Sequence, residues 1–177
     1  MWFTGLSGSG KTTLSQIVVE QLFDRGFKCV VIDGDQLRAG LNRDLGFSDE
    51  DREENLRRAA EVAEMFLNVG FIVLVPMISP LREVRDKIRL RYHPKDYVEV
   101  YVKCSIEACE ERDPKGLYHK ARMGEIRNFT GMDAIYEVPI QSELTIDTEH
   151  ESVEACANEL AEFIINKFVI NDIKERG

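Results

Sequence analysis

Residues 5–12 read GLSGSGKT and match the pattern G-x-x-x-x-G-K-[ST] at every specified position. The motif follows a short apolar strand stub, Met1–Thr4, and precedes a helical pattern, Thr12–Phe23. In this strand–loop–helix context the motif binds phosphate, because its glycines let the loop curl and point backbone N–H groups at an anion. The start of the helix adds partial positive charge. The stretch therefore predicts an α/β protein that binds a nucleoside triphosphate.

Two side chains of this loop have separate predicted tasks. Lys11 reaches the β- and γ-phosphates, and the hydroxyl of Thr12 ligates the Mg²⁺ that accompanies them. The alternative to a phosphate-binding loop is a glycine-rich turn with an exposed lysine. That alternative does not explain why residues 5–12 match the motif at every specified position. The residues of this stretch that we predict to bind ATP are Gly5, Leu6, Ser7, Gly8, Ser9, Gly10, Lys11, Thr12 and Thr13.

Short apolar runs alternate with helical patterns along the rest of the chain. The further runs that we predict to be strands are residues 28–32, 71–75, 97–102 and 144–146. Runs without polar alternation are typical of parallel sheets, whose strands are buried on both faces. The further predicted helices are residues 48–70 with Ser48 as N-cap, one opened by Ser79 and Pro80, a short one at 105–111 and a last one at 153–168. We therefore predict one α/β domain, residues 1–177, with a mainly parallel sheet.

The composition narrows the class of protein. The chain has 177 residues, of which 44% are apolar, so a single buried core is expected. Its net charge of −9 argues against a protein that binds nucleic acid or a membrane surface. No secretory signal or apolar membrane span is evident, so we expect a cytoplasmic protein. The cysteines form no C-x-x-C pair and are expected to be reduced thiols: Cys29, Cys104, Cys109 and Cys156.

An anionic ligand in this acidic chain requires locally placed positive charge. Residues 112–127, RDPKGLYHKARMGEIR, supply a surplus of three positive charges, five basic residues against two acidic ones. A small kinase needs a lid that keeps water from the transferred phosphoryl group, and we predict one at about residues 110–132, within an irregular region, 112–140. A GTPase would need an N-K-x-D motif, which the sequence lacks, and a transport ATPase is usually larger.

The stretch DGDQLRAGLNRDLGF, residues 33–47, follows the second predicted strand. The carboxyl ends of parallel strands face the ligand crevice, so Asp33 is expected across from the phosphate loop. A carboxylate there can accept the proton of an acceptor hydroxyl or hold the water shell of Mg²⁺, and Asp35 could take either task. The alternative is a turn aspartate that caps the next segment, and for Asp35 both interpretations stay open.

Arg52 and Asn55 lie three residues apart on one predicted helix and share a face. A guanidinium group beside an amide suits an anionic oxygen group, since guanidinium offers a planar fork of donors. The alternative is a surface arginine that pairs with Asp49, Glu53 or Glu54. For Arg52 taken alone, the interpretation as a surface arginine is favoured. Only the sequence around it favours a role in binding an anionic group.

Five blocks of this sequence resemble the adenylylsulfate kinase (APS kinase) family in order and spacing. They are WFTGLSGSGKTT (2–13), DGDQLRAGLNRDLGFSDEDREENLRR (33–58), PMISPLREVRDKIR (76–89), CEERDPKGLYHKAR (109–122) and IRNFTGMDAIYEVP (126–139). The resemblance implies a three-layer P-loop kinase fold with about five strands, flanking helices and a mobile lid. It also implies that ATP·Mg²⁺ donates its γ-phosphoryl group to the 3′-hydroxyl of adenosine 5′-phosphosulfate (APS), which yields 3′-phosphoadenosine 5′-phosphosulfate (PAPS) and ADP.

By the same resemblance, Phe47 and Phe129 sandwich the adenine of the acceptor, and Arg52 and Asn55 hold its phosphosulfate end. Base stacking of this kind is worth about 1–3 kcal/mol per base. Arg112 is placed on the adenine of ATP. The implied acceptor-binding residues are Asp35, Gln36, Leu37, Arg38, Phe47, Arg52, Asn55, Ile78, Ser79, Lys115, Asn128 and Phe129. The predicted catalytic residues are Lys11, Asp33, Asp35 and Ser79, and the predicted Mg²⁺ ligand is Thr12, with Asp33 reaching the ion through water.

Ser79 has been described in the family as a phosphoserine intermediate. In-line transfer to a positioned hydroxyl needs no covalent relay, so we expect Ser79 to cap the helix that begins at Pro80 and to contact ligand. The sequence departs from the family pattern at Gln36, where Asn is more usual, and at His119, where Lys is frequent. Neither change removes a predicted catalytic group.

Partners and alternative functions are less constrained. Family members are often dimers, so we expect a homodimer, and an association with a separate ATP sulfurylase is left open. Two other functions remain: another P-loop small-molecule kinase, acting on a nucleotide or sugar acid, and a non-catalytic nucleotide-sensing subunit. The latter would fit a broken phosphate loop, whereas Lys11, Thr12, Asp33 and Asp35 are intact.

Overall fold

A five-stranded sheet forms the centre of the structure, a computed structural model that describes residues 1–170. The strands are β1 (Trp2–Thr4), β2 (Cys29–Val31), β3 (Ile72–Pro76), β4 (Glu99–Lys103) and β5 (Leu144–Asp147). Their order is β2-β3-β1-β4-β5, and every pairing is parallel. The predicted parallel sheet is confirmed, with each strand close to its predicted position. Because all strands run the same way, their carboxyl ends meet at one edge.

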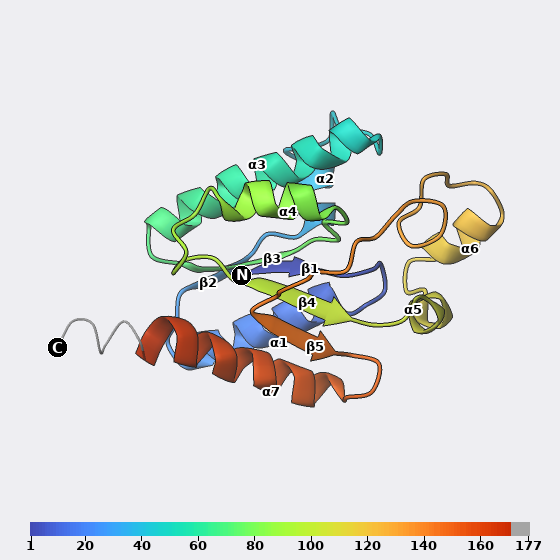
Figure 1. The fold of residues 1–177 in the computed structure, drawn as a ribbon. Coiled ribbons are helices and arrows are strands. Elements are labelled where there is room, and N and C mark those ends of the chain that lie inside the picture. The colour runs from blue at the N-terminus through green and yellow to red at the C-terminus, as the bar shows by residue number, and fades with distance from the viewer. Residues whose placement is uncertain (171–177) are drawn as a thin grey trace.

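Helices cover both faces of the sheet and make three layers (Figure 1). They are α1 (Lys11–Asp24), α2 (Gly34–Ala39), α3 (Asp49–Asn68), α4 (Arg82–Arg89), α5 (Ile106–Arg112), α6 (Leu117–Arg122) and α7 (Val153–Ile164), which continues into a π-helix, Ile165–Ile170. Figure 1 shows α2, α3 and α4 over one face and α1 and α7 over the other. α5 and α6 stand beyond the carboxyl ends of the strands. Residues 171–177 of the predicted domain lie outside the described residues.

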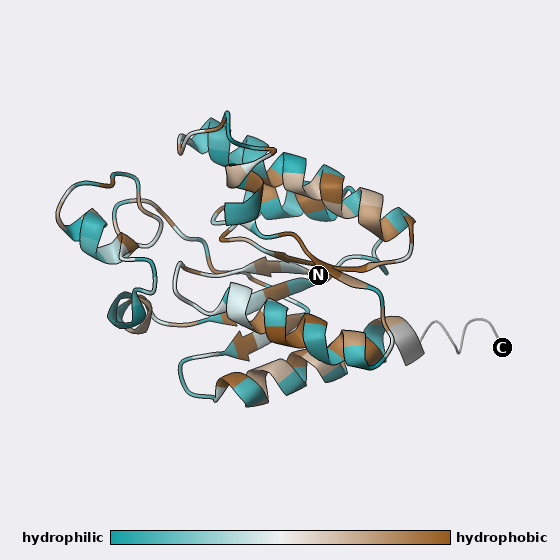
Figure 2. Cartoon of the chain, turned by 180° about the vertical axis from the view of Figure 1, so that it is seen from behind, coloured by the Kyte–Doolittle hydropathy of each residue, from teal (hydrophilic) through white to brown (hydrophobic). Residues whose placement is uncertain are grey.

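The strands are apolar on both sides because both faces of the sheet are covered. Trp2 and Phe3, neighbours in β1, point into opposite halves of the core, with 2% and 0% of their surface exposed. Figure 2 shows hydrophobic strands between helices that carry both hydrophilic and hydrophobic residues. No helix within residues 1–170 has the length and apolar character that a membrane span requires. All four cysteines are free thiols, as predicted.

Two short helices, α2 and α6, lie in segments for which the sequence predicted none. Asp33 Oδ1 accepts a hydrogen bond from the N–H of Asp35 at 2.8 Å and caps the start of α2. The two oxygens of Asp113 accept from the N–H groups of Tyr118 and His119 at the start of α6. Each aspartate satisfies N–H groups that a helix start leaves without partners. Residues 112–140 are therefore partly helical, not irregular throughout.

The start of α3 agrees with the prediction, whereas that of α4 does not. Ser48 caps α3 by accepting from a backbone N–H of its first turn. α4 begins only at Arg82, whose N–H donates to a carboxylate oxygen of Glu137 at 2.7 Å. Ser79 has a positive φ of 44°, and its hydroxyl accepts from the side chain of Trp2. The prediction that Ser79 caps this helix is therefore wrong, because a distant glutamate takes that place.

Candidate active site

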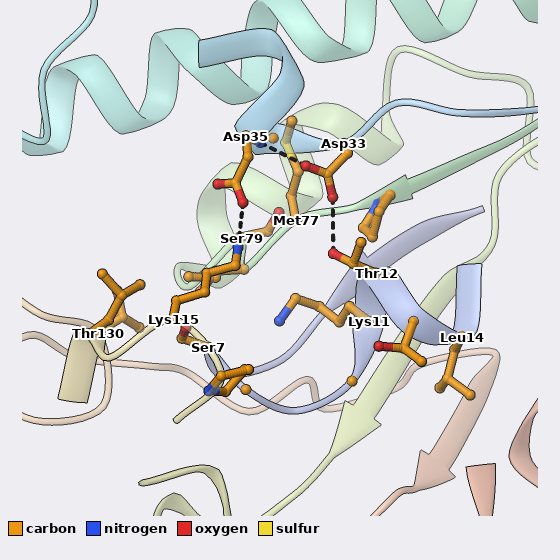
Figure 3. A pocket seen from close by; sticks show the side chains of 18 of the residues that line it. Ser7, Lys11, Thr12, Leu14, Asp33, Asp35, Met77, Ser79, Lys115 and Thr130 are labelled. Carbon is orange, nitrogen blue, oxygen red and sulfur yellow. Dashed lines mark hydrogen bonds and ion pairs between the residues drawn. The ribbon is translucent and has the colours of Figure 1, made fainter. Parts of the chain in front are cut away.

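A cavity of about 1670 Å³ opens at the carboxyl edge of the sheet (Figure 3). Its wall combines the phosphate loop, α2, the start of α3, the turn after β3 and the segment around α6. Pockets for one drug-sized ligand measure about 300–1,000 Å³, so this cavity has room for two nucleotides. The predicted site residues that line it are Ser7, Gly8, Gly10, Lys11, Thr12, Thr13, Asp33, Asp35, Gln36, Arg38, Phe47, Arg52, Asn55, Ile78, Ser79, Arg112, Lys115 and Phe129.

The remaining predicted residues lie behind this wall. Leu37 packs against the apolar cluster between α3 and the sheet, and Leu6 packs against the cluster formed around α5 and α6. Gly5 and Ser9 form the underside of the phosphate loop, where Ser9 is fully buried. Asn128 takes part through its backbone carbonyl, which accepts a hydrogen bond from an arginine of the wall.

Lys11 is folded over the phosphate loop. Its Nζ donates to the carbonyl oxygens of Gly5 at 2.9 Å and Leu6 at 2.6 Å, and to the hydroxyl of Ser9 at 3.3 Å. The side chain is 7% exposed, and burial lowers the pKa of Lys11 to about 8. Phosphate oxygens would offer this amine stronger, charge-assisted hydrogen bonds. Lys11 is therefore placed to exchange the loop carbonyls for a nucleotide.

Two glycines bring the phosphate loop into close contact with the sheet and α5. A Cβ atom on Gly5 would lie 2.6 Å from the carbonyl oxygen of Val102, and one on Gly8 would lie 2.9 Å from that of Cys109. Gly8 also has a φ of +78°, which a side chain rarely tolerates. The shape of the loop thus depends on the missing side chains at both positions.

Thr12 and Asp33 present oxygen atoms beside the loop (Figure 3). The Thr12 hydroxyl donates to Asp33 Oδ2 at 2.9 Å. Hydroxyl and carboxylate oxygens are ligands that Mg²⁺ prefers, usually together with phosphates and water. Residues 1–170 contain no group of three or more His, Cys, Asp or Glu side chains able to hold a metal ion. The oxygen pair therefore fits a Mg²⁺ ion that arrives with a nucleotide.

Asp35 reaches across the cavity to Lys115, which precedes α6 (Figure 3). The two side chains form an ion pair, with 70% of the Asp35 side chain and 52% of the Lys115 side chain exposed. An exposed ion pair contributes little to the free energy of folding. A charged group of a ligand could therefore replace either partner of this pair at a small cost in free energy. Two predicted site residues from distant parts of the chain are thereby brought together.

Arg52 joins α3 to the loop after α6. Its Nε donates to the carbonyl of Phe47 at 3.0 Å, and its Nη groups donate to the hydroxyl of Thr130 at 2.8 Å and to the carbonyl of Asn128. These partners are not the acids of its own helix that the alternative required. Burial, and then the charge of Arg52, lower the pKa of Arg38. The two guanidinium groups thus concentrate positive charge at this end of the cavity.

Phe47 and Phe129 both line the cavity but differ in burial. Phe47 is 66% exposed, and the guanidinium carbon of Arg38 lies 4.4 Å from its ring centroid. Phe129 is 8% exposed and packs edge to face on Tyr118, with ring centroids 4.9 Å apart. Phe129 therefore belongs to a buried cluster of the cavity wall, whereas Phe47 is a surface aromatic.

Tyr118 lies behind the cavity wall, where it supports two residues of the site, and nothing in the sequence indicated this role. Its hydroxyl donates to the carbonyl of Ser7 in the phosphate loop at 2.9 Å, and its side chain is almost fully buried. The ring thus connects Phe129 with the phosphate loop. Tyr118 lies in a basic stretch that follows a glycine, without the regular spacing of apolar residues that marks a buried face. The sequence therefore did not indicate that its side chain is buried. The segment predicted as a lid is anchored at this residue.

Ser79 is fixed by several partners that were also missed. Its hydroxyl accepts from the indole N–H of Trp2 at 2.8 Å, and its carbonyl accepts from Thr4 at 3.2 Å and from Arg85 at 2.7 Å. These contacts join β1 and α4 to the turn that carries Ser79. Arg112, which also lines the cavity, donates to the carbonyl of Thr148 at 2.6 Å.

The parallel sheet, the phosphate loop after β1, the carboxylate at the end of β2 and a cavity for two substrates together define a P-loop small-molecule kinase. Within this class, the sequence model described as adenylylsulphate kinase matches residues 1–147. The chain belongs to the adenylylsulphate kinase family.

Similar proteins agree with this assignment. A probable adenylyl-sulfate kinase of Bacillus subtilis (strain 168) is 52% identical over 167 residues, which cover 94% of this chain and 85% of that protein. An adenylyl-sulfate kinase of Geotalea daltonii is 49% identical over 171 residues, 97% of this chain and 84% of that protein. The structure of the Mycobacterium tuberculosis APS kinase in complex with AMPPNP and APS has a TM-score of 0.87 and 46% identity, covering 92% of this chain and 95% of that chain.

Proposed function

We propose that this chain transfers the γ-phosphoryl group of ATP to the 3′-hydroxyl of APS and releases PAPS and ADP. The observation that carries this proposal is one cavity in which the phosphate loop and the arginine–aromatic group of Arg38, Phe47 and Arg52 share a wall. The first suits the phosphates of a donor, and the second suits an acceptor with an aromatic base and an anionic end. The similarity to an APS kinase that holds AMPPNP and APS supports it.

The donor binds through the phosphate loop. Backbone N–H groups and the amine of Lys11 hold the β- and γ-phosphates, and Arg112 packs on the adenine. Mg²⁺, held by Thr12 and through water by Asp33, would neutralise charge on the phosphates. The hydrogen bond between Thr12 and Asp33 already places both oxygens on the same side of the loop.

The acceptor binds through stacking and through charge. Its adenine lies between Phe47 and Phe129, where Phe129 is held by the core and the exposed ring of Phe47 closes from outside. Arg52 and Asn55 donate hydrogen bonds to the phosphosulfate end. These contacts place the 3′-hydroxyl toward the phosphate loop, and holding the two reactants in line is the main source of rate acceleration in such transfers.

Asp33 is our first choice as the group that accepts the proton of the 3′-hydroxyl, because it follows β2 and lies beside Thr12 of the phosphate loop. Asp35 is the second choice, and its ion pair with Lys115 links α2 to the predicted lid. Ser79 acts as a ligand contact and forms no phosphoserine, since in-line transfer needs no covalent relay. Closure of residues 110–132 excludes water from the phosphoryl group.

An acceptor panel tests the proposal. The purified protein is incubated with γ-labelled ATP, Mg²⁺ and, separately, APS, AMP or gluconate. Of the three acceptors, we expect only APS to react, and to give labelled PAPS with one ADP released for each PAPS formed. Transfer to AMP or gluconate but not to APS would indicate another small-molecule kinase, and nucleotide binding without turnover would indicate a sensing subunit. Either result contradicts the proposal.

We also propose that the protein works as a cytoplasmic homodimer. Light scattering on the purified chain measures its mass in solution, and a mass of one chain at assay concentrations would contradict the dimer. An association with ATP sulfurylase stays a prediction.

A further inference from the structure

Asn42 lies behind the cavity wall and is connected to it through one side chain. It sits between α2 and α3 and is 0% exposed. Its Nδ2 donates a hydrogen bond at 2.9 Å to Oδ1 of Asn55, which is 7% exposed and lines the cavity. The backbone of Asn42 is fixed as well, because its N–H donates to the carbonyl of Leu37 at 2.8 Å and its carbonyl accepts from Leu45 at 3.1 Å.

This hydrogen bond decides which end of the Asn55 amide faces the cavity. Because Oδ1 of Asn55 is occupied by Asn42, the Nδ2 group remains for a ligand in the cavity. An amide has a donor end and an acceptor end, and only the donor end attracts an anion. The guanidinium groups of Arg38 and Arg52 line the same cavity, so the donor orientation agrees with the charge around it.

The opposite orientation of the two amides is less favourable. In the structure, Asn42 Oδ1 is a buried atom without a hydrogen-bond partner. If both amides turned over, Asn42 Oδ1 would accept from Asn55, and the Nδ2 group of Asn42 would lose its partner instead. Buried N–H groups without partners are rarer in proteins than under-used carbonyl oxygens. Turning over would also direct the Asn55 oxygen at an anionic ligand.

We propose that Asn42 is a positioning residue that holds the Asn55 amide as a hydrogen-bond donor for the anionic end of the acceptor. The inference rests on the proposed function, since it assigns the phosphosulfate group of APS to Asn55. Asn42 touches no substrate itself. Its effect is confined to acceptor affinity, and the donor nucleotide at the phosphate loop does not depend on it.

Asn42→Asp tests the orientation directly. An ionised carboxylate of the same shape only accepts hydrogen bonds, so Asn55 must turn its Nδ2 toward residue 42 and its oxygen toward the ligand. We expect the Kd for APS, measured by calorimetry with AMPPNP at pH 8 to 9, to rise about tenfold or more. The Kd for AMPPNP should stay within about twofold, which shows an intact fold. Asn68→Asp, at the exposed end of α3, adds the same charge as a control.

A protonation signature separates this role from simple destabilisation. A protonated carboxyl at position 42 can donate to Asn55 again, so the APS affinity of Asn42→Asp should recover as the pH falls, whereas the wild type should show no such recovery. If Asn42→Asp does not fold, Asn42→Ala decides: a rise of threefold or more in the Kd for APS supports the role, and an unchanged Kd overturns it.

The outcomes also separate this inference from the proposed function. If the wild type does not phosphorylate APS, the proposed function fails and the inference fails with it. If the wild type does so, but Asn42→Asp binds APS as tightly as the wild type at pH 8 to 9, then Asn55 offers its oxygen and only the inference is overturned.

Discussion

The indole N–H of Trp2 donates a hydrogen bond to the hydroxyl of Ser79 across 2.8 Å, from the first strand to the turn after β3. Both side chains are buried, with 2% and 1% of their surface exposed. The backbone of Ser79 is held by Arg85 at the same time. A serine fixed in this way has a set orientation in the cavity wall, which suits a ligand contact better than a nucleophile that must move in and out of line.

Ser79→Ala should therefore leave a working enzyme. We expect kcat to fall by about tenfold or less, because the transfer needs no serine ester. The free energy of unfolding should fall by about 1–3 kcal/mol, because the buried N–H of Trp2 loses its partner. Steady-state kinetics and a denaturant titration measure the two effects. An inactive variant, together with phosphate covalently attached to wild-type Ser79 in a mass spectrum, would restore the phosphoserine mechanism.

Nucleotide affinity should depend on pH through Lys11. Burial lowers the pKa of Lys11 to about 8 in the nucleotide-free protein, whereas bound phosphates favour the charged amine. Above pH 8 the amine must take up a proton as the nucleotide binds, so the Kd for AMPPNP should increase with pH by up to about tenfold per unit. Titrations between pH 7 and 9.5 measure this slope.

Two variants of Lys11 provide the controls for that slope. Lys11→Arg keeps its positive charge over the whole window, so its affinity, although lower, should not fall above pH 8. Lys11→Ala should abolish transfer. A flat profile in the wild type would show that the amine is already fully protonated before the nucleotide binds.

The two aromatic residues should differ in what their loss does to the fold. Phe47→Ala removes an exposed ring, so we expect about a tenfold weaker Kd for APS with unchanged stability. Phe129→Ala should weaken APS binding far more than ATP binding and also lower the free energy of unfolding by roughly 3 kcal/mol, because this ring is buried. Phe23→Ala is the matched control for Phe47→Ala, because Phe23 is also an exposed phenylalanine. Equal losses of APS and ATP affinity in Phe129→Ala would argue against stacking.

Asparagine substitutions rank the two candidate bases. Asn is as good an N-cap as Asp, so Asp33→Asn should keep α2 folded while removing the group that accepts the proton. We expect its kcat to fall by about a hundredfold or more. Asp35→Asn should mainly raise the KM for APS, because Asp35 lines the cavity as a predicted contact of the acceptor. The reverse ranking, with near-normal turnover in Asp33→Asn, would make Asp35 the base.

Local sequence patterns were sufficient for the donor side of the site. The phosphate loop is contiguous, and the carboxyl end of a buried parallel strand faces the same crevice. The position of Asp33 across from the loop therefore followed from the order of elements, whereas its hydrogen bond with Thr12 was seen only in the structure. Ser48 was recognisable as a cap because its partner lies within the next turn. These features depend on residues that are close in sequence or on the direction of the strands.

The contacts that needed the folded chain could not be predicted in this way. Tyr118 and Arg85 are held by residues far along the chain, Ser7 and Glu137. Asn42 is held by a side chain of the next helix, and nothing in the sequence around these three residues marks them as buried. The error at Ser79 has the same origin, since Glu137 supplies the partner at the start of α4 from a distant loop. α2 and α6 were missed because aspartates that cap short helices resemble turn aspartates.

In the proposed complex, APS lies in this cavity with its sugar oxygen facing the donor phosphate. A crystal structure of the protein with AMPPNP, Mg²⁺ and APS measures this directly. We expect the APS adenine between Phe47 and Phe129 and the phosphosulfate at Arg52 and Asn55. The 3′-oxygen should lie in line with the γ-phosphorus above Lys11. An acceptor bound with its adenine elsewhere, or with its 3′-oxygen turned away from the γ-phosphate, would contradict the proposed complex.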